Sequence, residues 1–212
     1  MSLAYLLGKG SAKWLKVKIN IPLIMVISIL PDVDLIIDHL TGSTLHRGPS
    51  HSLIFTIGAF LPFLIIYRKR AIPYLIAFSS HALIGDFFVG GVELLWPFSQ
   101  TKYGFTALSV FSPINILIEM ILFIAAMFVI CKTGDWKVFL SGNKSNLLLI
   151  VPMFTVLLPT LIGFPFSKPL VLTEPALSLA HLVYLALFTI AVIKTLQSTY
   201  KQRLKPPLPS NG

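Results

Sequence analysis

The run SPINILIEMILFIAAMFVIC at residues 112–131 holds one charged side chain, Glu119. A helix of about 20 apolar residues can cross the ~30 Å hydrocarbon core of a bilayer. The rest of the chain is similar: 55% of its 212 residues are hydrophobic and 12% are charged, against about 25% charged in soluble domains. Mean hydropathy is +0.84. The sequence therefore predicts a multi-pass integral membrane protein of the cell membrane.

Apolar runs of similar length predict an all-α bundle of about six transmembrane helices. They lie at roughly 19–38, 51–67, 71–90, 112–131, 146–164 and 175–197. Residues 1–197 would then form a single membrane domain, in which the lysine-containing segment 1–18 lies on the membrane surface. The basic, Pro-rich tail at 198–212 is expected to be disordered.

Lysine and arginine predict the orientation of the bundle, because cytoplasmic loops are rich in these residues. With six spans, 14 of them fall on one side, and the other side has only Arg47, Lys102 and Lys168. Both termini are therefore expected to be cytoplasmic. The net charge of +9 then reflects topology and anionic lipid, and no nucleic-acid partner is expected. Seven of the eight acids and all five histidines fall in the outer half.

Carboxylates within the apolar runs indicate a functional site, because each costs several kcal/mol in hydrocarbon unless it is paired, coordinated or hydrated. Asp32 and Asp34 follow Pro31, which disrupts the helix around it. On such a distorted segment the two acids could converge, or one could bind a ligand while the other orients a neighbour.

Histidines accompany these acids in two further motifs. In HRGPSHS at 46–52, a Gly-Pro turn between His46 and His51 could bring both rings to one point. His81 and Asp86 are five residues apart, which is ~140° around a regular α-helix. Either the helix is irregular near Gly85, or the two residues serve different ions.

Histidine and carboxylate ligands together suit Zn²⁺, Mn²⁺ or iron. The one cysteine, Cys131, ends a separate apolar run. We expect one or two divalent ions, zinc ahead of manganese or iron, with the ligands Asp32, Asp34, His46, His51, His81 and Asp86. Asp34 is also the candidate general base, and Arg47 is a candidate for holding an oxyanion or a lipid phosphate.

The motifs LPDVD at 30–34, HRGPSHS at 46–52, and SHALIGDFFVGG followed by WPFS within 80–99 resemble those of the YdjM-type family of predicted membrane-bound, metal-dependent hydrolases. The resemblance covers roughly residues 20–100. It implies a multi-span protein with a metal site. The chain departs from the family pattern twice: many relatives have a histidine near the N-terminus, where this chain has Ala4-Tyr5-Leu6, and they often separate the third-span histidine and aspartate by four positions.

These observations lead us to expect a metal-dependent hydrolase of an ester or phosphodiester, with a lipid or lipid-linked substrate because the site lies at headgroup depth. The alternatives are a transporter, or a non-enzymatic membrane protein that binds ions or protons through the same residues. A transporter should have polar groups near the bilayer midplane, whereas the inner halves of the expected spans are nearly free of ionisable groups. The lipid bilayer is the expected partner.

Overall fold

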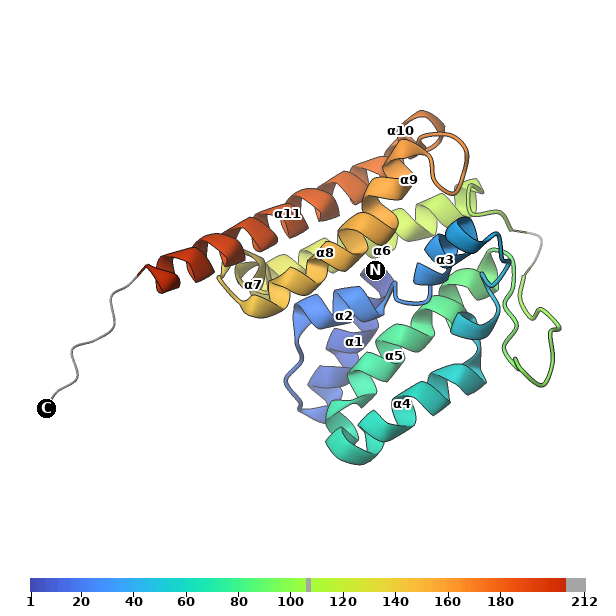
Figure 1. Ribbon diagram of the computed structural model, residues 1–212, viewed down its shortest axis with the longest axis horizontal. Helices are drawn as coiled ribbons and strands as arrows, with labels where there is room; N and C mark the ends of the chain where they lie inside the picture. The colour runs from blue at the N-terminus through green and yellow to red at the C-terminus, as the bar shows by residue number, and fades with distance from the viewer. Residues whose placement is uncertain (106–107, 205–212) are drawn as a thin grey trace, which may run out of the picture.

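The computed structural model of the protein describes residues 1–105 and 108–204, which fold into helices and connecting loops (Figure 1). The first half contains α1 (Ser2–Leu15), α2 (Ile21–Ile27), α3 (Val33–Thr41), α4 (Leu53–Tyr67) and α5 (Ile72–Ser80). The second half contains α6 (Pro113–Thr133), α7 (Trp136–Leu140), α8 (Ile150–Pro152), α9 (Leu158–Ile162), α10 (Leu170–Thr173) and α11 (Pro175–Arg203). Tighter 3-10 turns occur at Pro49–His51, Arg68–Arg70 and Lys144–Leu149, and wider π-helical turns at His81–Asp86 and Met153–Leu157. The described ranges have no β-strand, only an isolated bridge between Val92 and Tyr103, so the all-α prediction is confirmed.

Three helical segments of the described chain are long and apolar enough to cross a membrane: α6, Lys144–Ile162 and α11. The second segment joins α8 and α9 with the turns around them. Large apolar side chains such as Ile118 and Phe128 project from α6 and are exposed, as expected for a surface in contact with lipid. The prediction of membrane-spanning helices is therefore confirmed, although their number is smaller than the six expected.

The difference arises in the first half of the chain, where the helices are short. The run at 19–38 breaks near Pro31 into α2 and α3, which have 7 and 9 residues. The run at 51–67 forms α4, with 15 residues. At 1.5 Å per residue it rises ~22 Å, less than the ~30 Å hydrocarbon core. Hydropathy alone does not reveal these breaks, since the residues on both sides of each are apolar.

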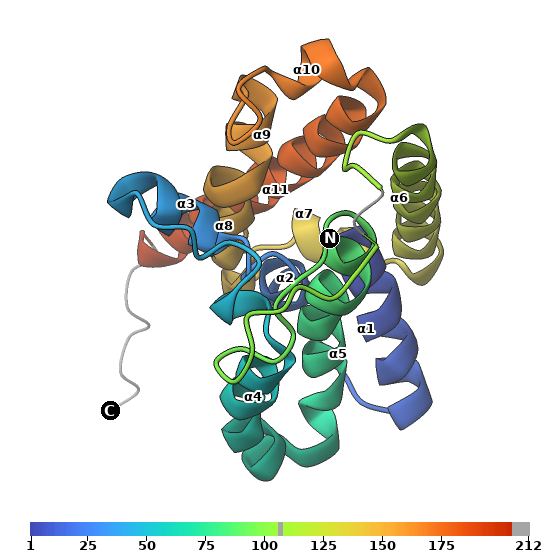
Figure 2. The ribbon, with the colours of Figure 1, turned by 90° about the vertical axis from the view of Figure 1, so that its right-hand side faces the viewer.

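The short helices of the first half pack on one another. α4 and α5 run side by side in opposite directions, joined by the turn Arg68–Arg70 (Figures 1 and 2). α1 packs against α5 and α6, and its Tyr5 and Ala12 are buried while Trp14 is exposed. One face of α1 is therefore packed within the bundle, and the membrane-surface position expected for residues 1–18 stays a prediction for its exposed face.

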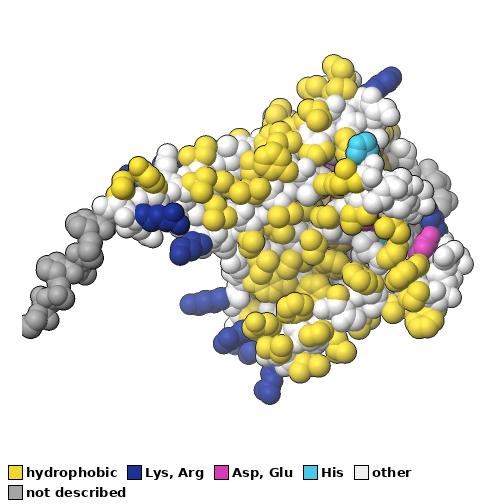
Figure 3. All heavy atoms as spheres, viewed as in Figure 1, with side chains coloured by type: hydrophobic (Ala, Val, Ile, Leu, Met, Phe, Trp, Pro, Cys, Tyr) yellow, Lys and Arg dark blue, Asp and Glu magenta, His cyan; other side chains and the backbone are white. Residues whose placement is uncertain are grey.

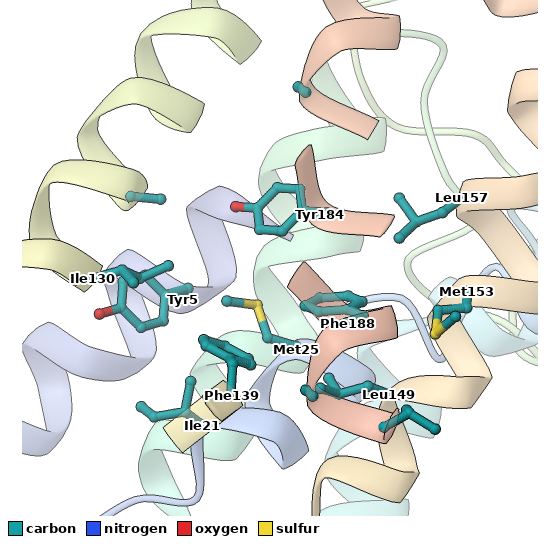
Figure 4. Packing of buried hydrophobic residues seen from close by; sticks show 14 of the residues in the cluster. Tyr5, Ile21, Met25, Ile130, Phe139, Leu149, Met153, Leu157, Tyr184 and Phe188 are labelled. Carbon is teal, nitrogen blue, oxygen red and sulfur yellow. The ribbon is translucent and has the colours of Figure 1, made fainter. Parts of the chain in front are cut away.

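The main hydrophobic core joins the two halves of the chain. Figure 4 shows Tyr5 and Met25 from the first half gathered with Phe139 and Phe188 from the second, and all four side chains are fully buried. At the edge of this core, the hydroxyl groups of Ser2 and Tyr184 lie 2.8 Å apart. The core thus ties the short N-terminal helices to the long α11.

A charged contact supplements this core at the end of α6. The Lys9 ammonium lies 2.6 Å from the Asp135 carboxylate, and the Tyr5 hydroxyl donates to the same group at 2.7 Å. Burial would raise the pKa of Asp135, but the hydrogen bonds from Lys9 and Tyr5 outweigh burial and hold this pKa below its ordinary value. The contact fixes α1 to the turn between α6 and α7.

The C-terminal helix is longer than expected. α11 continues to Arg203, past residue 198, where the disordered tail was expected to begin. The remainder of that expected tail, at 205–212, lies outside the described residues. The single membrane domain expected over 1–197 stays a prediction.

Candidate metal centre

The π-helical turn His81–Asp86 brings two expected ligands to the same side of the helix that begins with α5. A π-helix pairs residue i with residue i+5, so side chains five positions apart lie one above the other. His81 Nε2 and Asp86 Oδ2 are 3.0 Å apart as a result. The irregularity near Gly85 that we considered from the sequence is confirmed, and the two side chains share one site.

The break after α2 supplies two carboxylates. Asp32 is the N-cap residue of α3, and its side chain makes no capping hydrogen bond; its Oδ1 instead lies 3.0 Å from His81 Nε2. Asp34, two residues further along the chain, is buried, and its Oδ2 lies 3.3 Å from His51 Nδ1. The two acids therefore approach different nitrogens, since Asp32 lies near His81 Nε2 and Asp34 lies near His51 Nδ1. This geometry fits the alternative in which one acid binds a ligand while the other orients a neighbour.

His51 lies between these groups and is fully buried. The Gly48-Pro49 turn places it 5.1 Å from His46, measured between ring centroids, and 5.2 Å from His81. Its Nε2 atom lies 3.0 Å from Asp86 Oδ2 and 3.7 Å from Asp32 Oδ1. The expected approach of the two HRGPSHS histidines is thus present.

One ligand atom from each of four side chains lies within 4.8 Å of every other, which defines the four-residue cluster Asp32, His51, His81 and Asp86. His51 Nε2 and Asp86 Oδ2 are buried and have no hydrogen-bond partner, although only 3.0 Å separates them. If His51 is neutral and carries its proton on Nδ1, both atoms are acceptors, and their burial face to face is costly unless a cation lies between them. The donor set of two imidazoles and two carboxylates therefore fits a divalent ion.

Asp34, His46 and Ser50 form a second layer behind His51. Both oxygens of Asp34 are occupied: Oδ1 lies 2.9 Å from His46 Nδ1, and Oδ2 accepts a hydrogen bond from Ser50. Ser50 Oγ also lies 2.9 Å from His51 Nδ1. These residues include a second group that could hold a metal ion, Asp34, His46 and His51. In this structure each carboxylate oxygen of Asp34 takes part in a hydrogen bond within the protein.

Ser50 is a site residue that the sequence did not single out. It occupies the position directly before His51 in HRGPSHS, and its hydroxyl connects His51 to Asp34. Asp38, just beyond the break, has a different role, since its carboxylate accepts the backbone N–H groups of Leu45 and His46 at 2.7 and 2.8 Å. It holds the loop that carries the histidines.

Arg47 binds Oδ1 of Asp86, the carboxylate oxygen other than the one that lies near His51 and His81. Its Nη2 donates to Asp86 Oδ1 at 3.0 Å and its Nη1 to the carbonyl oxygen of Val89 at 3.3 Å. The guanidinium lies against the backbone of Gly90, where a Cβ atom would come within 1.9 Å of Nη1. Arg47 therefore positions Asp86 in this structure, and its expected contact with an oxyanion stays a prediction.

Two further ionisable residues lie apart from the cluster. Glu119 and His181 line a small pocket of about 70 Å³ together with Ser2 and Tyr184. His181 Nδ1 is 2.9 Å from the carbonyl oxygen of Leu177 in its own helix, which is typical of a packing histidine.

Comparison with known proteins adds one finding to this geometry. The model of the YdjM inner membrane protein family matches residues 1–199, a range that includes the long C-terminal helices as well as the three motifs. No curated protein and no solved structure gives a significant match.

Proposed function

This chain belongs to the YdjM inner membrane protein family, and from this premise and the four-residue cluster we propose that it is a membrane-embedded, metal-dependent hydrolase of an ester or phosphodiester. The observation that carries the proposal is the pair of unpartnered buried atoms, His51 Nε2 and Asp86 Oδ2. Ionisable side chains at membrane depth are functional by default because of what they cost.

The proposed ligands are the members of the four-residue cluster, and the ion is divalent. With neutral histidines, the carboxylates of Asp32 and Asp86 give the cluster a charge that a divalent cation balances. Zinc suits this donor set, as do manganese and iron. When bound, such an ion lowers the pKa of a coordinated water toward ~7 and polarises an ester or phosphoryl oxygen.

The residues behind the cluster hold the ligands in the state that binding needs. Ser50 donates its proton to Asp34, so its oxygen is free to accept the Nδ1 proton of His51. This hydrogen bond places the lone pair of His51 on Nε2, which faces Asp86. Arg47 occupies Asp86 Oδ1 and leaves Oδ2 for the ion.

Asp34 and His46 are proposed as positioning residues in place of the ligand roles expected from the sequence. Both oxygens of Asp34 take part in hydrogen bonds within the protein, which also leaves it poorly placed to act as a general base. His46 supports the other side of the same carboxylate. An outer shell of this kind orients ligands and raises their basicity.

The basic end of the molecule is proposed to face the cytoplasm. Most Lys and Arg side chains visible in Figure 3 lie over the end of α11 and the turn between α4 and α5, whereas the visible acidic and histidine side chains lie toward the opposite end. The positive-inside rule then places the cluster toward the outer side. Ser2 lies beside Tyr184 within the bundle, so the cytoplasmic position expected for both termini is proposed only for the C-terminal end of α11.

The test is metal content, measured by plasma mass spectrometry on detergent-purified protein. We expect wild type to bind zinc, manganese or iron, and Asp86→Asn and His51→Ala to lose it. His39→Ala is the matched control, since His39 lies outside the cluster and touches Phe164, with ring centroids 5.0 Å apart. Wild type that stays metal-free after incubation with each ion would overturn the proposal.

Metal-loaded protein should then be screened against ester and phosphodiester panels. Turnover that His51→Ala abolishes supports a hydrolase. Metal binding without turnover would favour a non-enzymatic ion-binding protein.

A further inference from the structure

An apolar groove of about 830 Å³ runs along the short helices and reaches Asp34 and Ser50, in the second layer of the candidate metal centre, whereas the four cluster residues are not among its lining residues. α2 contributes Leu23 and Ile27, α4 contributes Phe55 and Phe63, and α5 contributes Phe78. The hydrophobic surface over α2, α4 and α5 is visible in Figure 3. Its volume lies within the ~300–1,000 Å³ typical of small-ligand sites.

The polar residues of the groove lie at its two ends. Asp34 and Ser50 line one end, and Lys18 and Arg70 line the other. Ser50 Oγ is 2.9 Å from Nδ1 of the cluster residue His51. The groove is therefore continuous with the second layer of the metal centre.

The length of the groove follows from α4. Phe55 and Tyr67 both line it, and their separation of twelve positions on α4 corresponds to a rise of ~18 Å at 1.5 Å per residue. This exceeds the ~15 Å half-thickness of the hydrocarbon core. An extended lipid chain whose polar group lay near Ser50 would thus remain against apolar side chains along its length.

We propose that the groove holds the hydrocarbon chain of a membrane lipid, with the ester or phosphoryl group of that lipid beside Ser50 and Asp34. The assignment of a reacting group to that end rests on the proposed function. The presence of a lipid chain rests on the groove itself.

A transmembrane helix fits this groove less well than a lipid chain. A helix is about 10 Å wide with its side chains, so an ~18 Å length of it occupies ~1,400 Å³, well above the volume of the groove. A polar soluble ligand is disfavoured because the lining between the two ends consists mainly of aliphatic and aromatic side chains.

The experiment uses the full chain in nanodiscs that contain phosphatidylglycerol with a diazirine group on one acyl chain. After a chase with excess unlabelled phosphatidylglycerol, irradiation and peptide mapping locate the lipid that remains. We expect labelling at Phe63 and Tyr74 in the groove to persist, and labelling on the exposed face of α6 at Ile118 to be removed by the chase.

Two neighbouring positions on α4 give a matched pair of variants. Ala59 lines the groove, so Ala59→Trp should fill it and reduce groove labelling about tenfold, equivalent to ~1.4 kcal/mol of affinity. A Cβ atom on Gly58 meets nothing within 4 Å, so Gly58→Trp should label as wild type does. Ala59→Leu should give an intermediate loss and provides a test if Ala59→Trp does not fold.

Several results would overturn the proposal. The proposal fails if the chase removes labelling in the groove as completely as it removes labelling on α6. It also fails if Ala59→Trp leaves labelling in the groove unchanged. A halving of molecular mass in Ala59→Trp would show that a second copy of the chain fills the groove. The metal-site proposal and the lipid-groove proposal are tested separately by two variants. Asp86→Asn should lose the metal and keep the lipid, whereas Ala59→Trp should keep the metal and lose the lipid.

Discussion

His81 Nε2 and Asp86 Oδ2 lie 3.0 Å apart across a single π-helical turn. In a regular α-helix side chains five positions apart diverge by ~140°. The wider turn therefore makes the ligand pair, and it occurs where the helix reaches the metal centre, as π-turns often do at functional sites.

Deletion of Gly85 should preserve the metal centre. The deletion would leave histidine and aspartate four positions apart, and such a pair shares one face of an α-helix. Metal content should stay near the wild-type value, with the π-turn replaced by an α-turn. An alanine inserted after Gly85 should abolish metal binding, because side chains six positions apart lie ~120° apart around an α-helix and do not share a face. Metal loss in the deletion variant would show that the π-turn has another role.

Asp34→Asn should weaken the metal site without destroying it. Loss of an outer-shell partner costs about 10–100-fold in metal affinity, and Asp34 contacts His51 and His46 instead of the unpartnered atoms. Competition with a fluorescent chelator measures the affinity. Asp86→Asn should cause a larger loss. Equal losses in the two variants would make Asp34 a direct ligand.

Gly90→Ala should destabilise the protein. Gly90 has φ +150° and a Cβ atom there would lie 1.9 Å from Arg47 Nη1, so the variant combines backbone strain of ~1–3 kcal/mol with displacement of the arginine. Thermal unfolding in detergent should show a lower midpoint. Gly58→Ala, with open space around its Cβ atom, should raise the midpoint slightly because alanine favours helix by ~1 kcal/mol. An unchanged midpoint in Gly90→Ala would show that Arg47 moves away freely.

Acid should remove the stabilisation that Asp135 provides. Its pKa is lower in the folded protein than the usual ~3.9, so the contribution is present above ~pH 4 and is lost as pH falls through the folded pKa. The side chains of Lys9 and Asp135 are 28% and 13% exposed, which suggests about 1 kcal/mol or less. The free energy of unfolding of wild type and Asp135→Asn should be measured between about pH 3 and pH 7. The two curves of this free energy against pH should converge at low pH. A difference in stability between the two proteins that does not change with pH would show that the ion pair is not the cause of that difference.

Much of the candidate site could be predicted from sequence, because Pro31 and Gly48-Pro49 are strong local signals for breaks and turns. These breaks lie next to Asp32 and His51, which the structure brings together in the four-residue cluster. The sequence offered an irregular helix near Gly85 as one of two alternatives but could not choose between them, since a change in hydrogen-bond pairing leaves no distinctive residue type. The division of roles between Asp32 and Asp34 also depends on tertiary contacts, above all on the hydroxyl of Ser50.

The number of spans was overestimated for a related reason. Apolar content was read correctly at 19–38 and 51–67, but hydropathy does not report whether a helix is continuous. The run at 19–38 is interrupted near Pro31, between α2 and α3. The run at 51–67 ends at the turn Arg68–Arg70, which joins the short helix α4 to α5. The long runs without such breaks, such as 112–131, were predicted correctly.

The core contact of Tyr5 and Met25 with Phe188 has a consequence for biosynthesis. Every proposed ligand precedes residue 90, so the ribosome completes the ligand set before it makes α6 and α11. The short early helices have the site but lack the long helices that anchor a chain in lipid, and α11 is translated last. Assembly of the metal centre in its final surroundings is therefore a late event, and a translation arrest before residue 175 would leave a membrane intermediate with all its ligands and an unfinished core.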